Sequence, residues 1–410
     1  MTTIRVPYGR SFATAEVSDD VDVIEIQSAE AAPDPTAATH EALADPIGGF
    51  TWRGATSVAI AINDKTRPVP HQHLLPPLLD RLTEAGIPTD AITFYVAVGG
   101  HSPMTEPEFS EIVPQQILDR YRVVSHDAAS GDLMTLGETS RGTPATVNRG
   151  FVESDLKIVV GTIEPHQFAG FSGGVKSAAI GLAGPDTIDR NHAWMTDPAS
   201  RIGTYETNPA RQDIEELGEM IDIDLALNVI VNSGREIVRV LAGDPVTVME
   251  VGAPLARRYS QVGVANRYDV VVASPGGHPK DINVYQSQKA IASAAGIVRS
   301  GGTIVLTAAC PEGSGSAAYE QWVANHTTNE DVLEAFREEG FRVGPHKAFQ
   351  IARDSVDSPL IVVTDMPDEL TRRLLLTTAP DLQTALDDAG TPNGPVAVLP
   401  HASTTIPYVS

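Results

Sequence analysis

The segment LKIVVGTIEPHQFAGFSGGVKS, residues 156–177, gives the clearest indication of the fold class. Residues 156–161 form an apolar run of strand length, which leads into a Gly-rich loop and a helical pattern starting near Gly174. Two similar pairs of strand and helix patterns precede this segment: residues 58–62 with 74–85, and residues 92–98 with 106–121. Such alternation is typical of βαβ units around a parallel sheet.

The alternation restarts in the second half of the chain. Four apolar runs predict buried strands there, at residues 269–273, 303–308, 360–364 and 396–399. Helical patterns lie between them, at residues 283–295, 331–339 and 379–389. The chain has 410 residues, whereas a single hydrophobic core stops growing at roughly 250–300 residues. We therefore predict two α/β domains, residues 1–265 and 266–410, each with a mostly parallel sheet flanked by helices. We expect an active site in the cleft between them.

The composition excludes several classes of function. The chain carries 53 acidic and 29 basic residues, for a net charge of −24, so nucleic acid and anionic lipid are not expected partners. Its one cysteine, Cys310, excludes internal disulfides and multi-thiolate metal sites, which fits a reducing cytoplasm. We find no apolar run near the roughly 18 residues of a membrane span and no apolar signal segment in residues 1–10. A cytoplasmic location is therefore expected.

The acidic surface allows two interpretations, an ordinary acidic protein or adaptation to high salt. The chain has only 6 lysines beside its 53 acidic residues, which favours the second. Carboxylate repulsion acts over a Debye length of about 30 Å at 0.01 M salt but only about 3 Å at 1 M. We therefore expect the melting temperature to rise between low salt and molar KCl at fixed pH. A flat or falling melting temperature would favour the ordinary acidic protein.

Chemically useful residues follow the predicted strands. Ligands of open α/β sheets bind outside the carboxyl ends of the strands, where this sequence places NDKTRP (63–68), GGH (99–101), EPH (164–166), GFSGGVK (170–176) and SPGGHPKD (274–281). A single such turn could hold only a helix cap or a solvated charge. The Gly173-Gly174 pair could bind phosphate through free backbone N–H groups, or could form only a tight turn. Several such turns at one sheet edge favour a site.

The remaining histidines suggest no chemistry on their own. We interpret His71 and His73 as part of a solvated helix start. His40, His126 and His326 have no partners in sequence and are expected on the surface. His192 lies on a predicted helix over residues 186–195, where an isolated histidine would be a core or surface residue.

Taken together, these motifs resemble those of the lactate racemase family. EPHQFAGFSGGVKS (164–177) is similar to the central motif of that family, DKTRPVP (64–70) to its first motif, and Gly100-His101 to its second. Asn191-His192 matches the position of the family's nickel ligand. GGHPKD (276–281) and YQSQK (285–289) resemble its second-domain motif. The matches run in order from about residue 60 to residue 290.

The resemblance implies a cofactor and a set of site residues. The family uses a nickel-pincer nucleotide, a pyridinium mononucleotide that holds nickel through one carbon and two sulfurs. By resemblance His192 is the nickel ligand, Lys176 the covalent tether through a thioamide, and His101 and His166 the two acid/base groups. Histidine suits that role because its pKa lies near neutral.

The resemblance also assigns the groups around cofactor and substrate. Arg67 and Lys289 would hold the substrate carboxylate or the cofactor phosphate, and the other cofactor-binding positions are Asp64, Lys65, Thr66 and Gln286. The implied reaction is racemisation or epimerisation of a 2-hydroxy acid by hydride transfer. The implied partners are this substrate and the cofactor-synthesis enzymes, and the sequence does not indicate an oligomeric state.

Two positions depart from the family pattern. His278 stands where the motif has Tyr, and residues 344–348 lack an aromatic residue that lactate-specific members place near the substrate. His278, Lys280, His346 and Lys347 could recognise a larger or more polar hydroxy acid than lactate.

Two other functions stay open at this point. A nicotinamide-dependent hydroxy acid dehydrogenase is disfavoured because no G-x-G-x-x-G opens a helix after any predicted strand. An accessory protein that carries nickel or the cofactor without turnover would need His192 and Lys176, but not both His101 and His166.

Overall fold

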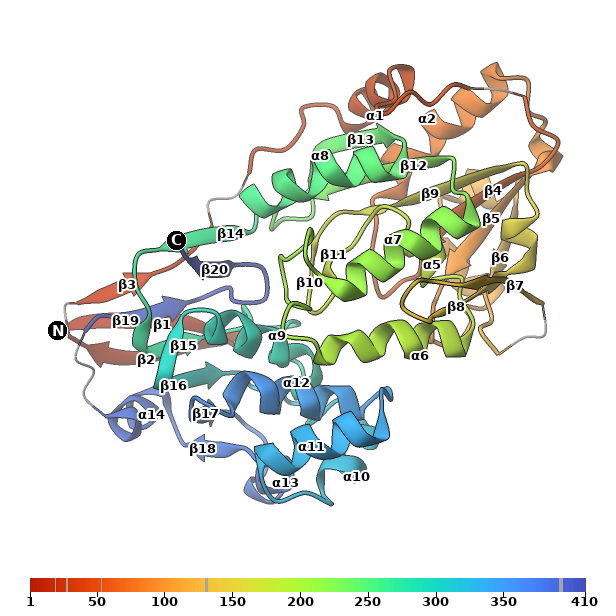
Figure 1. The fold of residues 1–410 in the computed structure, drawn as a ribbon. Helices are drawn as coiled ribbons and strands as arrows, with labels where there is room; N and C mark the ends of the chain where they lie inside the picture. The colour runs from red at the N-terminus through yellow and green to blue at the C-terminus, as the bar shows by residue number, and fades with distance from the viewer. Residues whose placement is uncertain (19, 27–28, 53, 130–131, 391–393) are drawn as a thin grey trace. The chain divides into compact units, whose positions relative to one another are not determined.

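The computed structural model describes residues 1–18, 20–26, 29–52, 54–129, 132–390 and 394–410. Contacts divide the chain into two compact units (Figure 1). The central unit spans Ser28–Tyr259, and the terminal unit combines Met1–Gln27 with Ser260–Ser410. Both are α/β units with a mostly parallel sheet flanked by helices, which confirms the predicted fold class.

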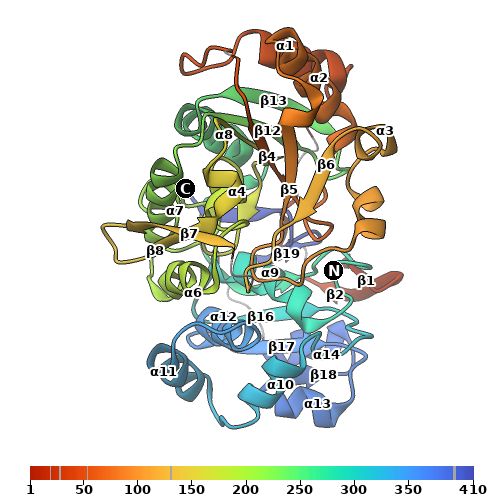
Figure 2. The same cartoon turned by 90° about the vertical axis from the view of Figure 1, so that its right-hand side faces the viewer.

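The described residues of the central unit form a six-stranded sheet. Its order is β13 (Ile237–Gly243), β12 (Leu225–Val231), β9 (Leu156–Thr162), β4 (Val58–Asn63), β5 (Ile92–Ala97) and β6 (Arg122–Ser125). Only β13 runs antiparallel to its neighbour. All residues of β4 and β9 are buried, because helices cover both faces of a parallel sheet, and their sequences are accordingly mostly apolar, with Asn63, Lys157 and Thr162 as the polar exceptions. Figure 2 shows β4, β5 and β6 side by side.

Helices and short hairpins complete the central unit. The helices are α1 (Pro35–Ala44), α2 (His71–Glu84), α3 (Gln115–Leu118), α4 (Arg149–Val152), α5 (Lys176–Ala179), α6 (Pro185–Ala193), α7 (Pro209–Ile221) and α8 (Pro245–Arg258), with 3₁₀ turns at Thr89–Ala91, Glu106–Glu111 and Trp194–Thr196. The hairpins are β7 (Leu133–Glu138) with β8 (Pro144–Asn148), and β10 (Pro165–His166) with β11 (Gly170–Phe171). On one face of the sheet, Leu74, Leu78 and Leu82 of α2 recur at helical spacing and pack onto Ile60 and Phe94.

The described residues of the terminal unit also form a six-stranded sheet, and all its neighbours are parallel. Its order is β18 (Thr377–Ala379), β17 (Leu360–Val363), β16 (Val298–Thr307), β15 (Tyr268–Ala273), β19 (Val396–Leu399) and β3 (Val21–Val23). The sequence analysis assigned residues 1–27 to the N-terminal domain. In the structure β3 pairs in register with β19, which places these residues in the terminal unit.

The remaining elements of the terminal unit cover its sheet. They are α9 (Val284–Ala295), α10 (Ala317–Val323), α11 (Asn329–Glu339), α12 (Pro345–Ser355), α13 (Asp368–Arg373) and α14 (Leu382–Ala389), the hairpin β1 (Thr2–Tyr8) with β2 (Ser11–Val17), and the pair β14 (Gln261–Val264) with β20 (Ile406–Val409). Ile4 and Val6 of the hairpin and Leu382 of α14 share a core with the strands. Among the described residues, no helix combines the length and hydropathy needed to cross a bilayer.

One predicted helix is wrong as a single element. The pattern over residues 106–121 is divided into the 3₁₀ turn Glu106–Glu111 and the short helix α3. Pro114 lies between them, where it cannot donate a helical hydrogen bond and disfavours helical backbone at Val113.

Two histidines that we expected in solvent are buried. His71 is 1% exposed, and its Nδ1 lies 2.7 Å from the carbonyl oxygen of Ile112. Burial lowers the pKa of His71 to about 4. His126 is 0% exposed, and its Nε2 lies 3.0 Å from the carbonyl oxygen of Ala183. A backbone carbonyl therefore pairs with one ring nitrogen of each imidazole inside the protein, and these partners are distant in sequence, while Nε2 of His71 is buried without a hydrogen-bond partner.

Candidate active site

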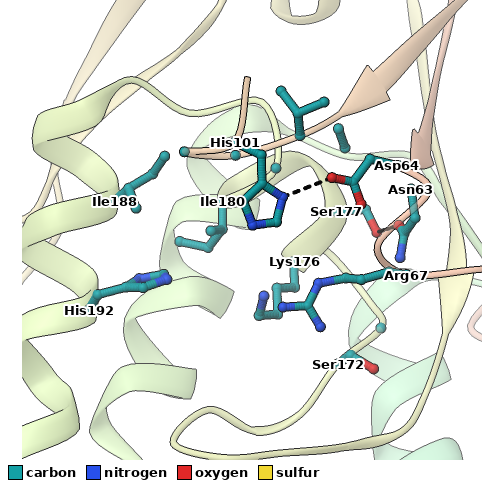
Figure 3. Close-up of a pocket in the computed structure, with 16 residues that line it drawn as sticks. Asn63, Asp64, Arg67, His101, Ser172, Lys176, Ser177, Ile180, Ile188 and His192 are labelled. Atoms are coloured by element: carbon teal, nitrogen blue, oxygen red, sulfur yellow. Dashed lines mark hydrogen bonds and ion pairs between the residues drawn. The ribbon is translucent and has the colours of Figure 1, made fainter. Parts of the chain in front are cut away.

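A pocket of about 110 Å³ lies at the carboxyl ends of β4 and β5 in the central unit (Figure 3). Its lining residues come from the ends of these strands and the loops after them, from the Gly-rich loop, from α5 and the turn that follows it, and from α6: Asn63, Asp64, Arg67, Ala97, Val98, Gly99, Gly100, His101, Ser172, Gly173, Lys176, Ser177, Ile180, Gly181, Ile188 and His192. Figure 3 shows His101, Lys176 and His192 extending toward this space from three different segments. Five of the predicted site residues thus meet in one pocket.

Asp64 and His101 form a hydrogen-bonded pair in the pocket wall. His101 Nδ1 lies 2.9 Å from Asp64 Oδ2, and the Asp64 side chain is 5% exposed against 56% for His101. Burial acts to raise the pKa of Asp64, but hydrogen bonds from His101 and Thr66 outweigh it and lower that pKa. The ionised carboxylate therefore accepts the Nδ1–H of His101 and orients the ring. In a neutral His101 this leaves Nε2 as the unprotonated ring nitrogen.

Lys176 begins helix α5 beside the pocket and is partly buried. Desolvation, and then the positive charges of Arg67 and Arg211, hold the pKa of Lys176 well below its usual range. The amine is therefore biased toward its neutral form, which is the nucleophilic one.

The loop before Lys176 depends on two glycines. Gly173 and Gly174 have φ values of 84° and 57°, the left-handed region that favours glycine. A Cβ on Gly173 would lie 2.6 Å from Cγ1 of Ile163, and one on Gly174 would lie 2.5 Å from Cγ of Met249. Larger residues would therefore displace this loop and Lys176 with it.

An aromatic ring joins the two other predicted histidines. The Phe168 ring centroid lies 4.9 Å from that of His166 and 4.8 Å from that of His192, with edge contacts on both sides. The Ala169 N–H donates to Nδ1 of His166 at 3.3 Å, so the proton of a neutral His166 lies on Nε2. His192 lines the pocket, whereas His166 lies on β10 outside the set of lining residues.

The other predicted cofactor-binding residues divide into two groups. Thr66 donates its hydroxyl to Asp64 at 2.6 Å and so supports the Asp64–His101 pair. Lys65 is exposed, does not line the pocket and pairs with Glu108. Gln286 and Lys289 belong to α9 of the terminal unit, and their assigned roles stay predictions.

Two buried charged residues of α7 support the site but are not predicted from the sequence. Arg211 is 1% exposed and Asp213 0% exposed. Asp213 accepts hydrogen bonds from Thr139 at 2.6 Å, Thr143 at 2.9 Å and Asn191 at 2.8 Å, and Asn191 precedes His192. The sequence shows only that Arg211 and Asp213 lie two residues apart on an amphipathic helix. This spacing does not reveal which groups they contact.

Comparison with known proteins agrees with the motifs in this pocket. The lactate racemase N-terminal domain model matches residues 8–203, and the lactate racemase C-terminal domain model matches residues 264–405. A lactate racemase from Thermoanaerobacterium thermosaccharolyticum is 30% identical over 402 residues, which cover 94% of each chain. A lactate racemase from Lactiplantibacillus plantarum is 28% identical over 412 residues, which cover 97% of each chain.

A solved structure extends this similarity to the fold. The apoprotein of lactate racemase from Thermoanaerobacterium thermosaccharolyticum matches with a TM-score of 0.90 at 28% sequence identity, over 99% of this chain and 100% of that chain. The family models and the relatives span both units of the chain. The chain therefore belongs to the lactate racemase family, and it is an isomerase of the racemase type.

Proposed function

We propose that this enzyme racemises or epimerises a 2-hydroxy acid by moving a hydride from and to the carbinol carbon, with a nickel-pincer nucleotide as cofactor. The observation that carries the proposal is the pocket that holds the Asp64–His101 pair, the desolvated amine of Lys176 and the imidazole of His192 together. These supply one of the two proton-transfer groups, the nucleophilic amine and the metal-ligating nitrogen that this chemistry requires, and the second proton-transfer group, His166, lies outside the set of lining residues.

The residues present fit the proposed cofactor. Among the described residues, no group of three or more His, Cys, Asp or Glu side chains could hold a metal ion, so His192 would bind nickel whose other ligands come from the nucleotide. Lys176 would hold the nucleotide covalently, since its amine is biased toward the neutral state. Gly173 lines the pocket, and its loop packs so closely against Ile163 and Met249 that neither Gly173 nor Gly174 has room for a side chain, which fixes the path of the backbone beside a bound ligand.

The chain's own residues would handle the protons and the carboxylate. When bound, the nucleotide supplies a reversible acceptor for the hydride of the substrate. His101, oriented by Asp64, would take the hydroxyl proton of one enantiomer through Nε2 and return it when that enantiomer is formed again. His166 would serve the other enantiomer. Arg67 in the pocket would hold the substrate carboxylate or the cofactor phosphate, with Lys289 as the second cation.

We also propose a substrate more polar than lactate. In the terminal unit, Nζ of Lys347 lies 3.3 Å from Oε1 of Gln288 and 4.5 Å from the ring centroid of Tyr285. His346 lies beside the same tyrosine, with Nε2 3.4 Å from the Tyr285 hydroxyl. His346 and Lys347 lie in the segment in which lactate-specific members carry an aromatic residue, and these two groups would favour additional polar atoms on the substrate.

Chiral chromatography of single enantiomers tests the proposed function. The protein is produced together with the cofactor-synthesis enzymes and incubated with the (R) or (S) form of lactate and of larger, more polar 2-hydroxy acids. We expect each reactive substrate to reach a mixture of both enantiomers without added nicotinamide, and the more polar acids to react faster. A requirement for NAD with accumulation of 2-keto acid would instead indicate a dehydrogenase. A fully nickel-loaded protein without turnover on any of these acids would contradict the proposal.

A further inference from the structure

Helix α7 buries a guanidinium directly behind the loop that carries Lys176. Arg211 is among the largest fully buried side chains of the described residues, at 1% exposure. An arginine cannot shed its charge, and burying an ion costs several kcal/mol unless its hydrogen bonds and charge are matched. The buried guanidinium of Arg211 therefore needs specific partners for its hydrogen bonds and its charge. α7 lies between the two segments that the family models match, residues 8–203 and 264–405.

Glu215 neutralises the charge of the Arg211 guanidinium on one side. Its Nε lies 2.7 Å from Oε1 of Glu215, and Nη2 lies 2.6 Å from the same oxygen. The hydroxyl of Tyr205 donates to that carboxylate at 2.8 Å. Glu215 is one helical turn after Arg211, so α7 carries both members of the ion pair.

The other side of the guanidinium holds the backbone of the Gly-rich loop. Nη1 donates to the carbonyl oxygen of Phe171 and Nη2 to that of Gly173, both at 3.1 Å. A Cβ on Gly174 would lie 2.9 Å from Nη2, which shows how closely the guanidinium and the loop are packed. Two fixed carbonyls, three and five residues before Lys176, restrict the path of the chain into α5.

We infer that Arg211 is a positioning residue for Lys176: its fork of hydrogen bonds fixes the Phe171–Gly174 loop, so that the lysine amine is held desolvated at the pocket, ready for attachment of a cofactor. The inference rests on the proposed function for the purpose of that amine, but not for its geometry. Lysine could not replace Arg211, because a single ammonium cannot reach two carbonyls and a carboxylate in one plane.

Several charged or titratable groups of the central unit surround Lys176. Asp64, Arg67, His101 and His192 line the same pocket, and Arg211 lies on α7 with its partner Glu215. Desolvation is the largest cause of the lowered pKa of Lys176, ahead of Arg67 and Arg211. Loss of the fork should therefore act mainly by letting water reach the amine, and only secondarily through charge.

Competitive acetylation of the cofactor-free protein measures this effect. Trace acetic anhydride is applied between pH 6 and 11, and peptide mass spectrometry gives the rate at each of the 6 lysines. In the unaltered chain the rate at Lys176 should level off at a lower pH than at the exposed Lys65. In Arg211→Lys, which keeps the charge but loses the fork, we expect the midpoint for Lys176 to rise by at least about one pH unit, a roughly tenfold slower reaction at pH 7.

Two further variants separate hydrogen bonding from charge and from general loosening. Arg211→Met combined with Glu215→Gln removes the ion pair as well as the fork, and should raise the midpoint at least as far. Arg257→Met is the matched control, since Arg257 lies 5.7 Å from the ring centroid of Phe171 and pairs with Glu206 at 3.0 Å, and it should leave the midpoint unchanged.

The outcomes decide the inference independently of the cofactor. An unchanged Lys176 midpoint in Arg211→Lys would overturn it, even if the double variant shifted, because Arg211 would then act through charge alone. A parallel gain of reactivity at the buried Lys157 would also overturn it, since the unit as a whole would be loosened. If the midpoint shifts as expected but the holoenzyme shows no adduct on Lys176, the positioning role holds and the covalent part of the proposed function fails.

Discussion

Lys176→Ala is expected to abolish the covalent cofactor adduct completely. The unaltered protein, produced together with the cofactor-synthesis enzymes, should be heavier than its chain by the bound nucleotide. Lys176 is the lysine among the lining residues of the pocket, and its pKa is held well below the usual range, so its amine is the nucleophile expected to carry the adduct. Mass spectrometry of the intact protein measures the adduct, and peptide mapping locates it.

Lys157 provides the matched control for this loss. It is a buried lysine on β9 of the same unit, 7% exposed, with Nζ 3.3 Å from the carbonyl oxygen of Ser154. Lys157→Met should keep the adduct, provided that a melting curve shows it folded. Unaltered protein that carries nickel and racemises its substrate without any added mass would contradict a covalent tether and favour non-covalent binding.

His101→Ala and His166→Ala are each expected to lower kcat by about 10²–10⁴-fold, the usual effect of removing a general acid/base group. Both variants should retain nickel and the adduct, because neither side chain is assigned to hold the cofactor. His192→Ala should also retain the adduct, but its nickel content should be reduced. Metal analysis and intact mass, measured on the same samples as the rates, separate the two patterns.

Asp64→Asn refines the prediction for His101. The amide keeps the shape of the carboxylate but removes its negative charge, which lies 2.9 Å from Nδ1 of His101. The imidazole ring of His101 therefore loses its fixed orientation. We expect an intermediate loss of kcat, smaller than that of His101→Ala. Normal racemisation by both histidine variants would show that the two-base assignment is wrong.

The sequence predicts the central strands β4 and β9 well because these strands are buried on both faces and mostly apolar. Val58–Asn63 and Leu156–Thr162 are buried at every residue, and such runs can be recognised without knowing their neighbours. The helical pattern over residues 106–121 fails because apolar spacing does not report the restriction that Pro114 places on the chain. His71 and His126 were misplaced since their carbonyl partners, Ile112 and Ala183, are 41 and 57 residues away.

The candidate site shows a similar limit. Asp64 and His101 were both selected from strand ends and motifs, but the hydrogen bond between them spans 37 residues and appears only in the folded chain. Arg211 and Asp213 could not be predicted as supporting residues from the sequence. Arg211 donates to two backbone carbonyls and Asp213 accepts from Asn191, and neither kind of contact can be recognised before the chain is folded. A residue that supports a site by binding backbone groups does not form a recognisable sequence motif.

The register of β3 with β19 has a consequence for biosynthesis. Val21 is opposite Val396, and the residues between them include the whole central unit. At a ribosomal rate of roughly 5–20 residues per second, β3 emerges from the ribosome tens of seconds before its partner strand exists. During that interval Ser28–Tyr259 can fold, whereas Thr2–Val23 has only its own hairpin to form and exposes an unpaired strand edge. The sheet of the terminal unit therefore cannot be completed until its last strands have been translated.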